Sequence, residues 1–198
     1  LLEDAALAAL TRAAEIAESY GAQSHDLAFI RTRRWREMLA RIFDELALRP
    51  ALARVRSLSV VHAERSDHRG ASAEAELLVG WLAARLGWRP AFTDAAGKSV
   101  QVDVSSAARP DVIPGCMLSV EVIADLPAGA LRARVDRDTD GEHLSWTVES
   151  PAAPAQVRRF ATPRRDDAEL VERAIRSFQA DQLLRETLAF CRSWKTHA

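Results

Sequence analysis

The chain has 198 residues, 48% of them hydrophobic, which is enough to bury a core in one large domain or two small ones. Its formal net charge of -1 at pH 7 argues against a nucleic-acid-binding protein. No apolar run approaches membrane-spanning length, and Cys116 and Cys191 are too few for a disulfide framework, so we expect a cytoplasmic protein without a membrane anchor.

The first 50 residues are predicted to be mainly helical. Apolar residues recur at helical spacing over residues 1–20 and again over residues 33–46. The expected buried faces are Leu2, Ala6, Ala9, Leu10, Ala13, Ile16 and Ala17 in the first helix, and Trp35, Met38, Leu39, Ile42, Phe43 and Leu46 in the second. Between them, residues 23–32 are expected to form a connection with a short extended piece at residues 27–30.

A turn and a strand are predicted to follow these helices. Pro50 ends the helical pattern, and residues 51–55 are expected to form one more turn. Residues 57–63 then alternate as a strand does, with Leu58 and Val60 on one face.

The helix predicted at residues 73–86 is unusually apolar. Ser72 is placed to cap its N-terminus, Glu74 near its start suits the helix dipole, and Gly87 follows its last apolar residue as a left-handed C-terminal cap would. Its wide apolar stripe is Leu77, Leu78, Trp81, Leu82 and Leu86. We therefore expect this helix to be buried against a sheet.

After Pro90 the apolar residues alternate with polar ones, which is typical of strands. Four segments show this pattern: Val100 to Val104, Leu118 to Val122, Leu131 to Val135 and Leu144 to Val148. Residues 157–161 form a shorter fifth one. Asp140 and Gly141 predict a hairpin between the third and the fourth. Such alternation indicates an antiparallel sheet covered on one face.

Two helices are predicted to close the chain. The first covers residues 166–178, with Asp166 and Glu169 in capping-box spacing, and the second starts at about residue 181. Their expected buried residues are Leu170, Val171, Ala174, Ile175 and Phe178, then Leu183, Leu184, Leu188, Cys191 and Trp194. The predicted fold class is α+β: an antiparallel or mixed sheet, a central buried helix and a C-terminal helical pair packed on one face.

The sequence contains no P-loop, no dinucleotide-binding glycine fingerprint, no HExxH and no GxSxG motif. Asp136, Asp138 and Asp140 before Gly141 match the start of a calcium loop. Thr147, at the twelfth position of such a loop, cannot supply the bidentate carboxylate. We therefore favour a polar hairpin turn over a calcium site.

Two further groups contain side chains with metal-binding or redox chemistry. His62, Glu64, Asp67 and His68 are suitable ligand types for zinc or iron, but their spacing fits no established rule, so we expect solvated loop residues and no metal. Cys116 and Cys191 have no CxxC partner and no adjacent base. We expect both to be small buried hydrophobic residues and not redox-active thiols.

Several segments resemble one known family. Residues 73–90, AEAELLVGWLAARLGWRP, resemble the helix that marks the glucose-6-phosphate dehydrogenase assembly protein family, called OpcA. Residues 26–44, DLAFIRTRRWREMLARIFD, resemble its pattern of Asp-Leu, an aromatic residue, Arg, Trp-Arg-Glu, Leu-Ala and Phe-Asp, and the acidic helix at residues 166–178 also fits. Phe29 stands where we expect Trp, and the pair Arg33-Arg34 replaces a turn pair such as Thr-Pro.

The resemblance also predicts how the chain is divided. The family's usual N-terminal portion is absent and position 1 is Leu, so we expect a fragment. Residues 1–50 would be a helical segment that connects to the missing N-terminal part. Residues 51–198 would form the α+β C-terminal domain.

The resemblance implies a non-catalytic factor that binds glucose-6-phosphate dehydrogenase and promotes its active oligomeric state. Such a factor raises flux into the oxidative pentose phosphate pathway and thereby the supply of NADPH. Because the nicotinamide chemistry belongs to the dehydrogenase, we expect no NADP site and no other cofactor in this chain.

The candidate partner-binding residues are Arg31, Arg33, Arg34, Trp35 and Arg36. Arginine and tryptophan are enriched at protein interfaces, and arginine suits phosphates and carboxylates. The alternative is that Trp35 lies on the apolar stripe of its helix and that the arginines form an ordinary solvated face.

Two other classes of function stay open. A small-molecule sensor or enzyme would have a pocket beside the helix at residues 73–86, with Arg31 or Arg85 holding an anionic sugar phosphate. A structural domain of a larger enzyme would only support a missing catalytic part.

Overall fold

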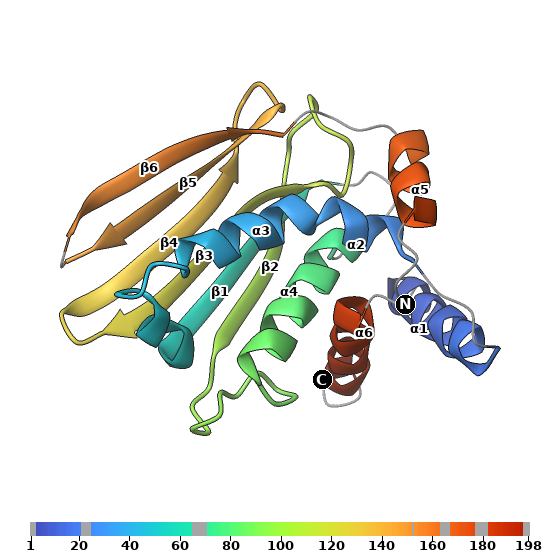
Figure 1. The fold of residues 1–198 in the computed structure, drawn as a ribbon, viewed down its shortest axis with the longest axis horizontal. Coiled ribbons are helices and arrows are strands. Elements are labelled where there is room, and N and C mark those ends of the chain that lie inside the picture. The colour runs from blue at the N-terminus through green and yellow to red at the C-terminus, as the bar shows by residue number, and fades with distance from the viewer. Residues whose placement is uncertain are drawn as a thin grey trace.

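A six-stranded sheet, whose strands lie side by side in Figure 1, forms the body of the molecule. The computed structural model describes residues 3–20, 25–64, 71–151, 153–162, 167–176 and 182–195. The strands are β1 (Val55–Ala63), β2 (Gln101–Ala107), β3 (Met117–Leu126), β4 (Gly129–Arg137), β5 (His143–Ser150) and β6 (Ala153–Ala161). Their order across the sheet is β2-β1-β3-β4-β5-β6, with β1 and β2 parallel and every other neighbouring pair antiparallel. The sheet is therefore mixed, and the predicted α+β class is confirmed.

Six α-helices and one 3-10 helix accompany the sheet within the described ranges. They are α1 (Glu3–Ser19), α2 (Leu27–Arg31), α3 (Arg33–Ile42), η1 (Arg49–Arg54), α4 (Ala73–Leu86), α5 (Asp167–Arg176) and α6 (Gln182–Lys195). Helix α4 packs on β1 and α3 packs on β4, so both cover the same face of the sheet (Figure 1). Helix α6 packs on α4, α5 on α2 and α1 on α6. None of the helices in the described ranges has the length and hydropathy of a membrane-spanning segment.

Alternating side chains place the core between the sheet and these helices. One row of buried, paired residues crosses four strands: Val60, Val120, Val135 and Trp146. Their chain neighbours, such as Ser119 and Arg134, point to the opposite face and are half-buried or exposed. A one-residue shift of register would exchange the two faces, so burial of this row fixes the pairing.

The caps of α4 are those that the sequence predicts. The Ser72 side chain accepts a hydrogen bond from the Ala75 amide at 3.2 Å. Gly87 adopts the left-handed conformation, with φ 65°, and the amide of Trp88 donates to the carbonyl of Ala83 at 2.9 Å. Since most residues of the helix are buried, the prediction of a central buried helix is confirmed.

The extended piece expected at residues 27–30 is wrong, because these residues begin α2. The Asp26 side chain accepts a hydrogen bond from the Phe29 amide at 2.7 Å and so caps this short helix. Helix α3 ends at Ile42, earlier than predicted, and Leu46 is 76% exposed instead of lying on the buried stripe. Helical periodicity therefore continues in the sequence beyond the point where the helix ends.

The buried faces of the outer helices are narrower than the sequence predicts. Ile16 of α1 is 54% exposed, whereas Leu10 and Ala14 pack against the core. Val171 and Leu183 are also exposed, although Leu170, Leu184, Leu188 and Cys191 are buried as expected. The predicted roles of Leu2, Ala6, Asp166, Ile175 and Phe178 lie outside the described residues and side chains.

Candidate functional site

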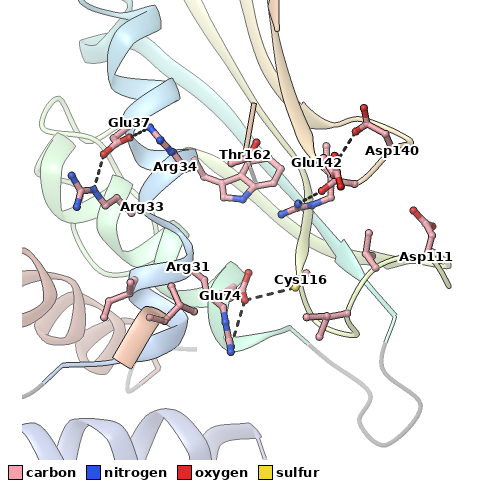
Figure 2. A pocket seen from close by; sticks show the side chains of 17 residues that line it. Arg31, Arg33, Arg34, Glu37, Glu74, Asp111, Cys116, Asp140, Glu142 and Thr162 are labelled. Carbon is pink, nitrogen blue, oxygen red and sulfur yellow. Dashed lines mark hydrogen bonds and ion pairs between the residues drawn. The ribbon is translucent and has the colours of Figure 1, made fainter. Parts of the chain in front are cut away.

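A cavity of about 320 Å³ lies at the N-terminal end of α4 (Figure 2). Helices α2, α3 and α5, the β4–β5 turn and residues 111–116 contribute its walls. The charged residues of the lining are Arg31, Arg33, Arg34, Arg137, Glu37, Glu74, Asp111, Asp140 and Glu142. In Figure 2 the arginines of α2 and α3 lie across the cavity from Asp111, Asp140 and Glu142.

Glu74, in the first turn of α4, is the most buried of these ionisable groups. It is only 7% exposed, and its Oε1 lies 4.0 Å from Arg31 Nη1 and 4.0 Å from Cys116 Sγ. Burial raises the pKa of the Glu74 carboxyl to about 7, although Arg31, a hydrogen bond from the Met117 amide and Arg137 oppose the rise. The group therefore titrates near neutral pH, which is common among functional carboxyls.

Arg137, the last residue of β4, forms part of the opposite wall. Its Nε donates to the carbonyl of Met117 at 3.0 Å, and its Nη1 donates to the carbonyl of Gly141 at 3.1 Å. The guanidinium carbon lies 5.7 Å from the centre of the Trp35 ring, so the tryptophan forms the floor beneath it. Within the described part of the chain, no carboxylate lies within ion-pair distance of Arg137.

The arginines of α3 share one carboxylate. Arg33 Nε and Arg34 Nη1 donate to the two oxygens of Glu37 at 2.6 and 2.9 Å. All three side chains are partly exposed, so these ion pairs contribute little to stability. Two cations facing one anion leave this wall of the cavity positively charged.

Two acidic residues of the rim, Asp111 and Asp140, are paired with cations outside the cavity. Arg109 donates to both oxygens of Asp111 at 2.8 and 2.7 Å. Arg159 pairs with Asp140 and with Asp138, each at 2.5 Å. This arginine therefore bridges two aspartates of the predicted hairpin turn. The hairpin is confirmed, and the pairing of its aspartates supports a polar turn in place of a calcium loop.

Four of the five candidate partner-binding residues line the cavity: Arg31, Arg33, Arg34 and Trp35. Trp35 is only 2% exposed, so it presents little surface to a protein partner in this structure. Arg36 turns away, because its Nη2 donates to the carbonyl of Phe29 at 3.2 Å and its guanidinium stacks 3.8 Å above the Phe29 ring.

Of the four residues considered as metal ligands in the sequence, His62 and Glu64 lie in the described part of the chain. His62 was expected in a solvated loop, but it lies in β1, is buried, and its Nδ1 is 3.0 Å from the carbonyl of Ala63. Asp67 and His68 lie outside the described residues. Over the ranges that the structure describes, no group of three His, Cys, Asp or Glu side chains could hold a metal ion.

Sequence reasoning missed the central members of the cavity. In the sequence Glu74 is only a charge that suits the start of a helix, and nothing singles out Arg137. Cys116, expected to be buried, is half-buried at the cavity wall, whereas Cys191 is fully buried as predicted. A glutamate followed by a long apolar stripe was the available signal for Glu74.

A comparison with known families finds a match. The model of the OpcA family, described as the C-terminal domain of the glucose-6-phosphate dehydrogenase subunit, matches residues 22–188, from just before α2 into α6. A comparison with curated proteins finds no match. Because the matched residues cover well over half of the chain, and include all three segments that carry the resemblance, the chain belongs to the OpcA family of C-terminal domains of the glucose-6-phosphate dehydrogenase subunit.

Proposed function

We propose that this chain belongs to a non-catalytic factor that binds glucose-6-phosphate dehydrogenase and promotes its active oligomeric state. The observation that carries the proposal is the match of residues 22–188 to a domain family named for that dehydrogenase. The NADP chemistry is then performed by the dehydrogenase, and this chain acts in the cytoplasm to increase NADPH supply.

Such a factor works through a difference in affinity. It must bind the active state of the dehydrogenase more tightly than the inactive state, and the population shifts by that difference alone. A tenfold preference corresponds to about 1.4 kcal/mol, which a few well-placed contacts can supply.

The α2–α3 surface is our candidate for the contact. The side chains of Arg31, Arg33 and Arg34 are 35%, 51% and 49% exposed, so they can reach acidic groups of a partner. Trp35 and Arg36 would act from beneath, by fixing the position of α3 on the core. This arrangement supports a charged contact surface at this site.

The first test mixes the purified chain with glucose-6-phosphate dehydrogenase and measures sedimentation and kinetics. We expect a larger assembly of the dehydrogenase and a severalfold change in its KM or kcat. The variant Arg33→Glu should weaken binding about tenfold, since it reverses a charge at the proposed contact.

Arg89→Glu is the matched control, because Arg89 is exposed beyond the far end of α4. It should bind as the unmodified chain does. Absence of binding at concentrations on the order of 10 μM would contradict the proposed function, since the affinity would then be too weak for a specific factor.

A further inference from the structure

We infer that the cavity at the N-terminal end of α4 binds a small phosphorylated organic molecule, held by the guanidinium groups of Arg31, Arg34 and Arg137. The inference goes beyond the proposed function, because it concerns a ligand of this chain in the absence of the dehydrogenase.

The arginines of the cavity wall are the groups that would attract an anion. Two of its rim carboxylates, Asp111 and Asp140, are held by Arg109 and Arg159, which lie outside the lining. Glu37 is shared by two arginines of the lining. The lining has five carboxylates and four arginines, but these pairings leave Arg137 with no carboxylate within ion-pair distance among the described residues, so its guanidinium can attract an anion.

Arg137 is the strongest single indication. It is only partly exposed, and its described hydrogen bonds use backbone carbonyls and no carboxylate. Those two bonds use only Nε and Nη1, so Nη2 is available to a ligand. Arginine presents a rigid fork of donors that matches two oxygens of a phosphate group, and such charge-assisted bonds are the stronger class.

Glu74 supplies an independent observation. Its carboxyl is buried on the cavity wall, where it accepts a hydrogen bond from the Met117 amide, and Arg31 Nη1 and Cys116 Sγ each lie 4.0 Å away. Figure 2 shows the carboxyl between these two groups. In its neutral form it can donate a hydrogen bond to a phosphate oxygen, whereas in its ionised form it would repel one.

The size and the remaining lining favour an organic phosphate over a bare inorganic ion. A volume of about 320 Å³ lies at the lower end of the range of small-molecule pockets, which starts near ~300 Å³. Ile30, Ile113 and Leu170 offer apolar surface to a carbon skeleton, and Thr162 and Glu142 offer polar groups to its hydroxyls.

The experiment is isothermal titration of the full chain, without the dehydrogenase, with glucose 6-phosphate, free glucose and inorganic phosphate as probes. We expect saturable binding of glucose 6-phosphate, weaker binding of phosphate and none of glucose. Arg31→Gln should weaken binding of glucose 6-phosphate at least about tenfold, because a charge-assisted hydrogen bond to the phosphate is lost. Arg85→Gln, an exposed arginine in the last turn of α4, should bind as the unmodified chain does.

The pH dependence provides a readout that a merely structural role would not give. The groups that act on Glu74 are Arg31 and Asp26 from α2, Arg137 from β4 and Cys116. Ionisation of Glu74 should weaken binding about tenfold between pH 6 and pH 8, because its pKa is about 7. Glu74→Gln should lose this dependence and bind more tightly than the unmodified chain at pH 8, and it also controls for the ionisation of the phosphate itself.

Three outcomes would overturn the inference: no saturable binding of glucose 6-phosphate, equal affinity in the Arg31→Gln variant, or binding of inorganic phosphate alone. Circular dichroism of each variant establishes that it is folded, and Arg34→Gln, at a more exposed position, replaces Arg31→Gln if that variant does not fold. Because the dehydrogenase is absent from the titration, failure here leaves the docking proposal to its own test.

Discussion

Helix α4 is buried in two different ways along its length. At Gly80 it meets α6 so closely that an added Cβ would lie 2.2 Å from Cys191 Sγ and 3.3 Å from Thr187 Cγ2. Less than two turns earlier, at Glu74, the same helix faces a cavity of about 320 Å³. Glu74 is almost as inaccessible to solvent as Gly80, but it is an ionisable group at the edge of a space.

The difference shows that burial alone does not say what limits a position. At Gly80 the limit is volume, because sulfur and methyl groups of α6 occupy the space where a side chain would go. At Glu74 the limit is charge, because burial disfavours the ionised carboxylate, whereas the adjoining cavity leaves room for the side chain. Substitutions that change only volume or only charge should therefore separate the two regions.

The largest effect is expected for Gly80→Ala. The new Cβ cannot remain 2.2 Å from Cys191 Sγ, so either the Cys191 side chain must change rotamer or α4 and α6 must move apart. Overpacking of this kind typically costs about 1–3 kcal/mol, and because the backbone carbonyl of Thr187 would also lie only 3.3 Å from the new Cβ, we expect a loss near the upper end of that range. Urea denaturation of the variant and the unmodified chain measures the change in the free energy of unfolding.

A second substitution tests whether the contact with sulfur is the cause. Cys191→Ala removes the sulfur, after which the nearest neighbour of the Gly80→Ala side chain is Thr187 at 3.3 Å, a tight contact that a small shift can relieve. The double variant should therefore lose less free energy of unfolding than the sum of the losses measured for Gly80→Ala and Cys191→Ala separately. If the two losses simply add, the close approach at this point is not what limits the position.

The next effect is expected for Glu74→Gln and should depend on pH. The pKa of Glu74 is about 7 in the folded chain against 4.5 for an ordinary glutamate, so folding favours the protonated form. Its contribution to stability is therefore fully present below about pH 4.5 and is lost as the pH rises through 7. The glutamine of the variant cannot ionise. The free energy of unfolding of the variant should therefore exceed that of the unmodified chain by about 2 kcal/mol at pH 8 and by little at pH 5.

Thermal or urea denaturation at pH 5 and pH 8 measures this difference. Glu149→Gln, on the exposed face of β5, is the matched control and should follow the pH dependence of the unmodified chain. A Glu74→Gln variant that is less stable than the unmodified chain at pH 8 would mean that the contact with Arg31 outweighs the cost of burial.

The comparison also explains how much of the fold was available from the sequence. Alternation in the strands and the caps Ser72 and Gly87 depend on local chemistry, so they were predicted to within a few residues. The end of α3 was not, because Leu46 continues the apolar spacing after the helix has left the core. The short helix α2 was missed because five residues carry too little periodicity, although Asp26 was a usable capping signal.

The cavity was harder to predict because its walls come from distant parts of the chain. Arg31, Glu74 and Arg137 lie on α2, α4 and β4, and only the pairing of β1 with β3 and of β3 with β4 brings them together. The cluster of arginines on α2 and α3 was visible in the sequence, and it does form one wall. The opposite wall required the sheet.

The smallest effect concerns the end of α4 at which the cavity lies, and it separates the cap from the charge. The Ser72 hydroxyl accepts a hydrogen bond from the Ala75 amide at 3.2 Å, and Ser72→Ala removes this bond while Glu74 remains. Loss of such a cap costs about 1 kcal/mol, and because neither serine nor alanine ionises between pH 5 and pH 8, the loss should be the same at both. Ser72→Asn, which keeps a capping oxygen, should retain more of that stability unless the larger side chain meets the buried surroundings of Ser72.

A loss from Ser72→Ala that grows with pH would show that the cap and the ionisation of Glu74 are coupled, since removal of the cap would then alter the surroundings of the carboxyl. A constant loss places the pH sensitivity of this region in Glu74 itself.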